Sequence, residues 1–144
     1  EEGAACACGT GTAYQALKRF DLSNGDTLAV FGQGPVGLSV TCLGAAMGAK
    51  IIAVDPVAMR RKLAEQLGAW QTIDPSDTEP VEAIMGLTRS EGTDASLDAT
   101  GIEEVQLNAI RSTRTWGRTC LVGVGGTLTI EPLTDIIKRQ ITLM

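Results

Sequence analysis

Residues 27–38 read Thr-Leu-Ala-Val-Phe-Gly-Gln-Gly-Pro-Val-Gly-Leu, a short apolar run followed by three glycines spaced G-x-G-x-x-G. The apolar run predicts a buried β-strand, and the glycines predict a tight turn that leads directly into a helix. Backbone amides lie open at the start of such a helix, where the helix dipole favours a diphosphate. An ordinary glycine-rich turn is the alternative interpretation, because the chain contains 17 glycines.

Each glycine of this pattern has its own expected role. Gly32 permits the tight turn, and Gly34 has no side chain to hold a pyrophosphate away from the backbone. Gly37 allows the helix to lie close against the preceding strand. Pro35 and Val36 stand at the helix start, beside the expected diphosphate.

A second apolar run, Lys50-Ile-Ile-Ala-Val-Asp55, ends in an acidic residue. A carboxylate about twenty residues after the glycines can reach the ribose hydroxyls of an adenine nucleotide. Strand, glycine turn, helix, strand and acid together predict a βαβ dinucleotide-binding unit. Asp55 could instead cap the next helix, since Pro56 suits a first helical position; the two roles are compatible.

The composition is that of a single domain with no sign of a nucleic-acid or membrane partner. The chain has 144 residues, of which 44% are hydrophobic. It carries 12 Lys and Arg against 17 Asp and Glu, and no long basic run stands out. Acidic proteins of this kind attract neither nucleic acid nor anionic membranes. No apolar stretch approaches the ~20 residues that span a bilayer, and we expect a cytoplasmic protein.

Cysteine and histidine usage limits the chemistry of the chain. Its four cysteines form no C-x-x-C pair, which argues against a disulfide framework or a self-contained four-thiolate metal site. Histidine is absent, so the commonest general base and metal ligand is missing.

Strands and helices alternate along the rest of the chain. We expect further strands at residues 70–73, 92–98 and 115–122 and from Gln140, a brief extended piece at 128–130, and helices over 13–20, 57–67, 79–88, 102–111 and 133–139. The helix over 57–67 is expected to turn Met59, Leu63 and Leu67 inward. This alternation predicts an α/β fold with a doubly wound parallel sheet of Rossmann type, in the strand order 3-2-1-4-5-6.

Ligands of such sheets bind beyond the carboxyl ends of the strands, where the strand order reverses. That rule selects the glycine turn, Asp55, and the loops that follow the fourth and fifth strands, Ala99-Thr-Gly101 and Gly123-Val-Gly125. These loops are short and consist of small residues. Such loops allow backbone to contact a ligand, although turn chemistry alone also favours Gly and Thr.

Several motifs, spread in order along nearly the whole chain, carry a family resemblance. They are Cys8-Gly-Thr-Gly-Thr-Ala-Tyr14, residues 24–38, Val54-Asp55, Leu67-Gly-Ala69, Asp98-Ala-Thr-Gly101 and Gly117-Arg-Thr-Cys-Leu-Val-Gly-Val124. Together they resemble the coenzyme-binding domain of the zinc-containing medium-chain alcohol dehydrogenases. The resemblance rests on order and spacing as well as on the glycines.

The resemblance implies a set of coenzyme-binding residues: Thr12, Gly32, Gly34, Pro35, Val36, Gly37, Asp55, Arg60, Thr100, Val122, Gly123 and Val124. Asp55 matches the acid that binds the ribose, and Arg60 matches a basic residue that helps hold it. A solvated basic face over residues 60–62 is the alternative for Arg60. Val122, Gly123 and Val124 would lie near the nicotinamide, and Thr12 would pack on its face away from the substrate.

Cys8 matches the one ligand of the catalytic zinc that this part of the family's chain contributes. Taken without the resemblance, Cys8 would be a small packing residue. The family's zinc is held by Cys₂His ligands with one open position.

The resemblance also implies a chemistry and an organisation. The expected reaction is reversible hydride transfer between a small alcohol and a nicotinamide coenzyme. We expect residues 1–20 to join an absent catalytic domain, residues 21–144 to form the dinucleotide-binding domain with a truncated sixth strand, and no catalytic residue within the chain. The chain alone should therefore be inactive, and relatives commonly form homo-oligomers through the sixth strand.

NAD is the expected coenzyme, because the carboxylate of Asp55 would repel the 2′-phosphate of NADP. Arg60 and Arg61 could soften that repulsion. Three alternatives stay open: a zinc-free reductase of the quinone or enoyl type in which Cys8 is incidental, an S-adenosylmethionine methyltransferase, and a non-catalytic nucleotide-sensing module.

Overall fold

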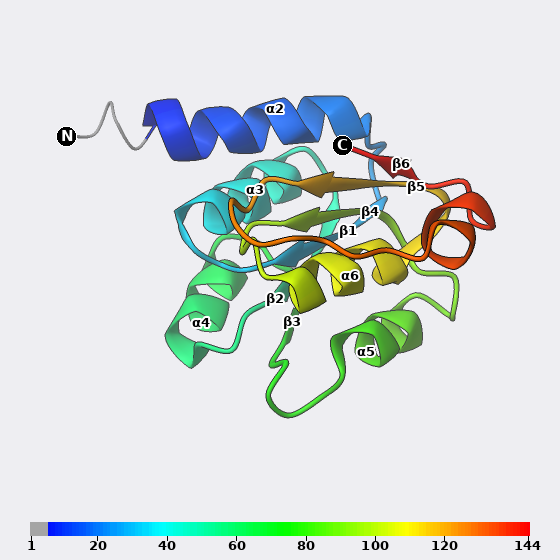
Figure 1. Ribbon diagram of the computed structural model, residues 1–144. Helices are drawn as coiled ribbons and strands as arrows, with labels where there is room; N and C mark the ends of the chain where they lie inside the picture. The colour runs from blue at the N-terminus through cyan, green and yellow to red at the C-terminus, as the bar shows by residue number, and fades with distance from the viewer. Residues whose placement is uncertain (1–5) are drawn as a thin grey trace.

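A six-stranded parallel sheet forms the centre of the computed structural model, which describes residues 6–144 (Figure 1). The strand order is β3-β2-β1-β4-β5-β6, and each neighbouring pair is parallel. This confirms the predicted fold class and strand order. The strands are β1 (Thr27–Phe31), β2 (Lys50–Val54), β3 (Gln71–Ile73), β4 (Thr93–Asp98), β5 (Thr113–Leu121) and β6 (Thr142–Leu143).

Helices cover both faces of this sheet (Figure 1). Side chains along a strand alternate between the two faces, and β1 accordingly sends Leu28 and Val30 into one core and Ala29 and Phe31 into the other. The first core includes buried residues of α2 (Gly11–Phe20) and α3 (Pro35–Ala46), and the second includes buried residues of α5 (Pro80–Leu87) and α6 (Glu103–Ser112). The helical elements are η1 (Cys6–Thr10), α2 (Gly11–Phe20), α3 (Pro35–Ala46), α4 (Ala58–Gln66), α5 (Pro80–Leu87), α6 (Glu103–Ser112) and η2 (Pro132–Ile137).

Residues 6–12 are helical, ahead of the helix predicted from residue 13. The wide π turns of η1 continue directly into α2, whose Ala13, Leu17 and Phe20 are buried in the core beside β1. The division of the chain at residue 20 stays a prediction. The expected extended piece at 128–130 forms no strand in the described chain, and residues 133–139 are covered by η2 and a turn.

The predicted inward face of α4 is wrong for Met59 and Leu63, while Leu67 is half-buried. Met59 is 81% exposed and Leu63 is also exposed, whereas Ala64 is fully buried. The helix contacts α3, β2 and β3, and it approaches them through the smallest side chain available. Close approach through alanine leaves the larger apolar residues outside.

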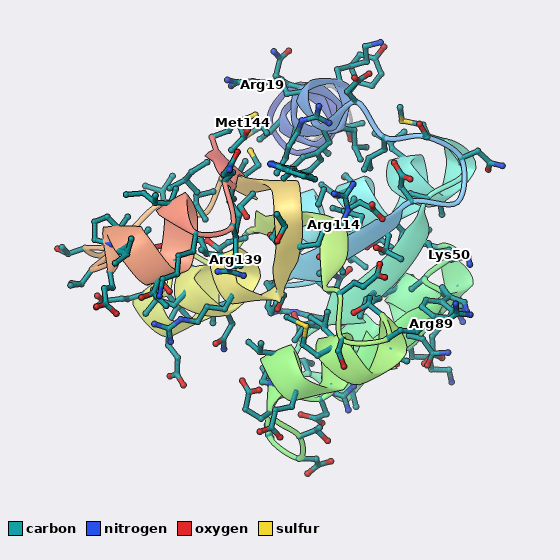
Figure 2. All side chains as sticks on the ribbon, turned by 90° about the vertical axis from the view of Figure 1, so that its right-hand side faces the viewer. Arg19, Lys50, Arg89, Arg114, Arg139 and Met144 are labelled. Carbon is teal, nitrogen blue, oxygen red and sulfur yellow. The ribbon has the colours of Figure 1, made fainter. Side chains whose placement is uncertain are left out.

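The amino ends of the strands face the viewer in Figure 2. Lys50, Arg89 and Arg114 lie there, around a hollow that also includes Trp70 (Figure 2). Asp94, near the start of β4, accepts hydrogen bonds from the Thr27 amide and hydroxyl and pairs with Arg114. Within residues 6–144, no helix combines the length and the apolar character needed to cross a membrane.

Candidate functional site

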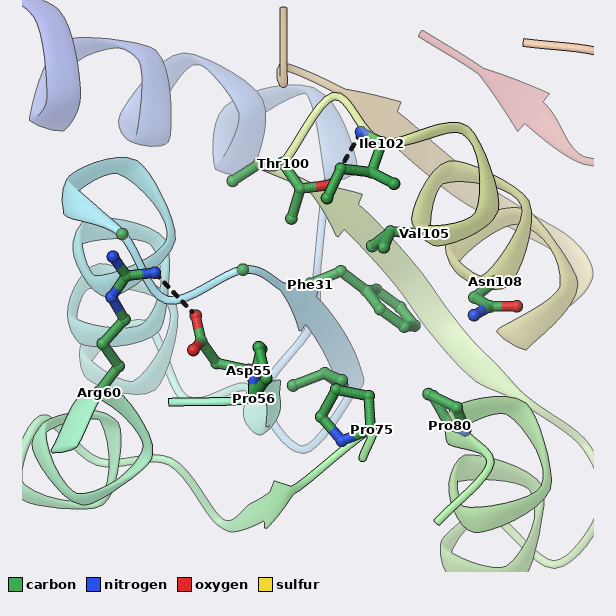
Figure 3. Close-up of a pocket in the computed structure, with 14 residues that line it drawn as sticks. Phe31, Asp55, Pro56, Arg60, Pro75, Pro80, Thr100, Ile102, Val105 and Asn108 are labelled. Atoms are coloured by element: carbon green, nitrogen blue, oxygen red, sulfur yellow. Dashed lines mark hydrogen bonds and ion pairs between the residues drawn. The ribbon is translucent and has the colours of Figure 1, made fainter. Parts of the chain in front are cut away.

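A pocket of about 400 Å³ opens at the carboxyl ends of β1, β2 and β4 (Figure 3). The glycine turn after β1 and the residues after β2 and β4 line it, including Gly34, Asp55 and Thr100. Phe31, Ile102 and Val105 add apolar surface. The pocket thus lies where parallel sheets of this strand order bind ligands.

The glycine turn is built so that side chains are excluded at two of its three glycines. Gly32 has φ +88°, a left-handed conformation that favours glycine, and a Cβ added there would lie 2.6 Å from Cγ2 of Thr100. A Cβ on Gly37 would collide with the carbonyl oxygen of Gly32. The start of α3 therefore lies against the turn and close to Val30 of β1, the strand against which it was predicted to pack.

Gly34 differs from the other two glycines. It is the N-cap of α3, its φ is −76°, and no described atom lies within 4 Å of where its Cβ would be. Pro35 and Val36 follow as the first residues of the helix. Open space over a helix start is what a diphosphate needs to reach the free amides.

Asp55 lies between the glycine turn and the start of the next helix, and it is 2% exposed. Its Oδ2 accepts a 2.7 Å hydrogen bond from the backbone N–H of Gln33, and its Oδ1 accepts one of 2.8 Å from that of Val57. A carboxylate has about four acceptor positions, so capacity remains for a ligand. The bond to Val57 shows that Asp55 also supports the entry to α4, although the N-cap itself is Val57.

Two neighbouring arginines take different positions around this carboxylate. Nη1 of Arg60 lies 3.6 Å from Oδ2 of Asp55, with its side chain 53% exposed at the pocket (Figure 3). Arg61 is instead anchored, since it donates to the carbonyl oxygen of Asp55 at 2.7 Å and pairs with Asp74 at 2.7 Å. Hydrogen bonds from Ser76 and the nearby Arg61 hold the pKa of Asp74 below its ordinary value.

The loops after β4 and β5 lie against each other. A Cβ on Gly123 would collide with the amide nitrogen of Gly101, and one on Gly101 would lie 2.7 Å from the carbonyl oxygen of Val124. Thr100 lines the pocket, and Val124 is exposed. Small residues are therefore required here by the contact between the loops.

Thr12 and Val122 are brought together from opposite ends of the chain. Both line a second hollow, of about 420 Å³, between α2 and the end of β5, and Met144 also borders it. This hollow is separate from the pocket that contains Asp55.

Cys8 lies in η1 with its side chain exposed. Among residues 6–144, no group of three His, Cys, Asp or Glu side chains is arranged to hold a metal ion. A catalytic zinc has three protein ligands, so the described residues can supply at most part of such a site. An exposed thiol fits the role of one ligand.

Reasoning from the sequence gave no role to two residues near the site, Gln33 and Asp98. Gln33 is fully buried; its side-chain amide donates to the carbonyl oxygen of Val30 and accepts from Thr41. Asp98 ends β4 as Asp55 follows β2, so an acid after an apolar strand was an available signal. Gln33 gave no comparable signal, because polar residues at a turn are usually exposed.

Comparisons with known proteins identify the family of this chain. The sequence model of the family described as zinc-binding dehydrogenase matches residues 35–144. The zinc-type alcohol dehydrogenase-like protein YphC of Escherichia coli is 36% identical over 141 residues, which are 97% of this chain and 40% of that protein.

Solved structures give the same result. The 2R,3R-butanediol dehydrogenase of Bacillus subtilis superimposes with a TM-score of 0.89 at 35% identity, covering 96% of this chain and 40% of that one. A zinc-binding dehydrogenase of Sinorhizobium meliloti, solved with NADP bound, gives a TM-score of 0.87 at 30% identity, covering 94% and 41%. The chain thus spans about two fifths of the length of these relatives.

Proposed function

Because this chain belongs to the zinc-binding dehydrogenase family and corresponds to the coenzyme-binding domain of alcohol dehydrogenases, we propose that it binds a nicotinamide dinucleotide across the carboxyl edge of its sheet. The observation that carries the proposal is the shared pocket of Gly34 and Asp55. Open space over a helix start and a buried carboxylate beside it match the two halves of an adenosine diphosphate.

The proposed path of the coenzyme follows the site residues in order. The adenosine occupies the pocket, with its ribose hydroxyls on Asp55 and Arg60 beside them. The diphosphate lies over Gly34, Pro35 and Val36. From the diphosphate, the nicotinamide half of the coenzyme passes Thr100 and Gly123. The nicotinamide ring would lie near Val122, Val124 and Thr12.

We propose NAD as the preferred coenzyme. A 2′-phosphate would meet the negative charge of Asp55, and Arg61 is held by Asp74 and so is not directed at it. Among residues 6–144, Arg60 is the one basic side chain that lines the pocket. A relative has been solved with NADP bound, so the coenzyme preference needs an experimental test.

Parallel titrations with NADH and NADPH test both proposals. Trp70 borders the hollow at the opposite edge of the sheet, so calorimetry or the coenzyme's own fluorescence is a better reporter than tryptophan quenching. We expect saturable binding that is tighter for NADH. Tighter NADPH binding would refute the preference, and absence of binding to both would refute coenzyme binding.

For the whole protein, we propose reversible hydride transfer between a small alcohol and the nicotinamide. Cys8 would contribute one thiolate to a zinc whose other ligands lie outside residues 6–144. When bound, zinc supplies Lewis-acid polarisation of the alcohol oxygen. The residues of this chain bind and orient the coenzyme, and the chain alone should not reduce NAD with any alcohol, as an absorbance assay at 340 nm would test.

We also propose that the protein self-associates through the edge formed by β6. Leu143 of that strand is exposed, as are Trp116, Leu133 and Ile137 in the segments near it. An edge strand bordered by apolar side chains favours pairing with another chain. Sedimentation velocity at several concentrations would reveal a monomer if the proposal is wrong.

A further inference from the structure

Asp98, the last residue of β4, is a fully buried carboxylate with three hydrogen bonds. Its Oδ1 accepts from the backbone N–H of Thr100 at 2.9 Å and from the Thr100 hydroxyl at 2.6 Å, and its Oδ2 accepts from the N–H of Gly101 at 3.0 Å. No Lys or Arg of the described chain forms an ion pair with it. Its charge is therefore stabilised by the loop that follows it.

The backbone of the same residue holds a second loop. The carbonyl oxygen of Asp98 accepts from the N–H groups of Val122, at 2.9 Å, and Gly123, at 3.1 Å. A Cβ on Gly123 would lie 2.7 Å from Oδ2 of Asp98. One residue thus joins the loops after β4 and β5, both of which border the proposed coenzyme path.

Thr100 extends this arrangement to the glycine turn. Its hydroxyl donates to Asp98 and accepts from the N–H of Ile102 at 3.1 Å (Figure 3). Its methyl carbon lies 2.6 Å from the position that a Cβ on Gly32 would take. The position of the turn and that of the pocket wall at Thr100 are therefore linked to the orientation of Asp98.

We propose that Asp98 is a positioning residue for dinucleotide binding, which sets the loops after β4 and β5 against the diphosphate turn without contacting the coenzyme itself. This inference rests on the proposed coenzyme binding. All three partners donate, so the loop geometry depends on an acceptor at both side-chain oxygens of Asp98.

Asp98→Asn is the direct test, because asparagine keeps the shape and changes the donors. An amide has one accepting oxygen and one donating nitrogen. The NH₂ group of the asparagine must therefore face either the N–H of Gly101 or the N–H and hydroxyl of Thr100. A buried donor left facing a donor is costly, and the loop is expected to move. We expect the dissociation constant of NADH to rise by about tenfold, which is within the range by which residues that do not touch a ligand alter its binding.

Asp94→Asn is the matched control, on the same strand. Asp94 lies at the opposite end of β4 and also accepts two hydrogen bonds from one threonine. Thr27 donates to it from its backbone N–H, at 2.7 Å, and from its hydroxyl, at 2.8 Å. The same substitution there should lower stability and leave the NADH dissociation constant within about twofold. Calorimetry of both variants under conditions where urea curves show them folded gives the comparison.

Thr100 provides a second route if Asp98→Asn does not fold. Thr100→Val removes the hydroxyl and keeps the size, so NADH binding should weaken, and Thr100→Ser should recover part of that loss. In the double variant with Asp98→Asn the losses should be less than multiplicative, because both changes remove the same bond.

The outcomes separate the inference from the function on which it rests. Unchanged NADH affinity in Asp98→Asn or in Thr100→Val, with normal binding by the parent chain, would overturn the positioning role alone. An equal loss in Asp94→Asn would show a general effect of destabilisation and would also overturn it. A parent chain that bound no dinucleotide would overturn the proposed function, and the inference with it.

Discussion

The backbone N–H of Gln33 donates to Oδ2 of Asp55 at 2.7 Å, although the two residues follow different strands. The bond ties the middle of the glycine turn to the acid that is proposed to bind the ribose. The side chain of Gln33 is fixed as well, since its amide donates to the carbonyl oxygen of Val30 at 3.0 Å and accepts from the Thr41 hydroxyl at 2.9 Å. The diphosphate and ribose parts of the proposed site therefore share one carboxylate.

Asp55→Asn should affect both parts. An asparagine can keep only some of these acceptor positions, so we expect NADH binding to weaken at least about tenfold, by the ~1.5–3 kcal/mol of a charged hydrogen bond. The preference for NADH over NADPH should shrink because the like charge is gone. Calorimetry with both coenzymes gives the numbers, and the exposed Asp77→Asn is a control with equal charge change. An unchanged preference would show that Asp55 does not choose the coenzyme.

Gly34→Ala and Gly37→Ala should separate binding from stability. Alanine at Gly34 meets no described atom in the free protein, so the free energy of unfolding should stay within about 0.5 kcal/mol, while the methyl group blocks the diphosphate. Alanine at Gly37 collides with the Gly32 carbonyl, and overpacking of this kind costs about 1–3 kcal/mol. Urea unfolding and NADH titration of both variants test the pair. Normal NADH binding by Gly34→Ala would place the diphosphate elsewhere.

Stability should fall in acid. Burial opposes ionisation of Asp94, but hydrogen bonds from Thr27 and Arg114 outweigh it and hold the pKa of Asp94 below the ordinary 3.8. Burial also opposes ionisation of Asp135, where hydrogen bonds from Glu131 and Arg111 outweigh it and lower the pKa in the same way. A lowered folded pKa contributes stability that is present above pH 3.8 and is lost as the pH falls through the folded value. Urea unfolding at pH 7 and pH 3 should show the loss. Asp94→Asn should be less stable at pH 7 and should depend less on pH; an equally steep dependence would contradict the assignment.

The thiols should differ in reactivity. Cys42 is exposed, whereas Cys120 is buried, and that burial raises the pKa of the Cys120 thiol. The thiolate is the reactive form, so iodoacetamide at pH 8 should modify Cys42 well before Cys120. Cys120 also lines the hollow with Thr12 and Val122, so NADH should slow its labelling and leave that of Cys42 unchanged. Peptide mass spectrometry over time measures both rates, and equal protection would argue against a nicotinamide near that hollow.

The strand order and the place of the pocket were predictable because few topologies satisfy alternating strands and helices with right-handed crossovers. The inner face of α4 was not, because hydrophobicity ranks Met59 and Leu63 above Ala64, while a close helix approach selects the smaller residue. Gln33 was not predictable either, since its burial depends on two partners, Val30 and Thr41, that only the folded turn brings within reach. The assignments of Cys8 and of the individual coenzyme contacts stay predictions.

The contacts of Thr100 with Gly32 and of Gly101 with Gly123 mean that the rim of the proposed site is already assembled in the free protein. A ligand that binds to a preformed site needs no slow conformational closure. In stopped-flow mixing, NADH should therefore associate in one exponential phase whose rate rises in proportion to its concentration, without a plateau.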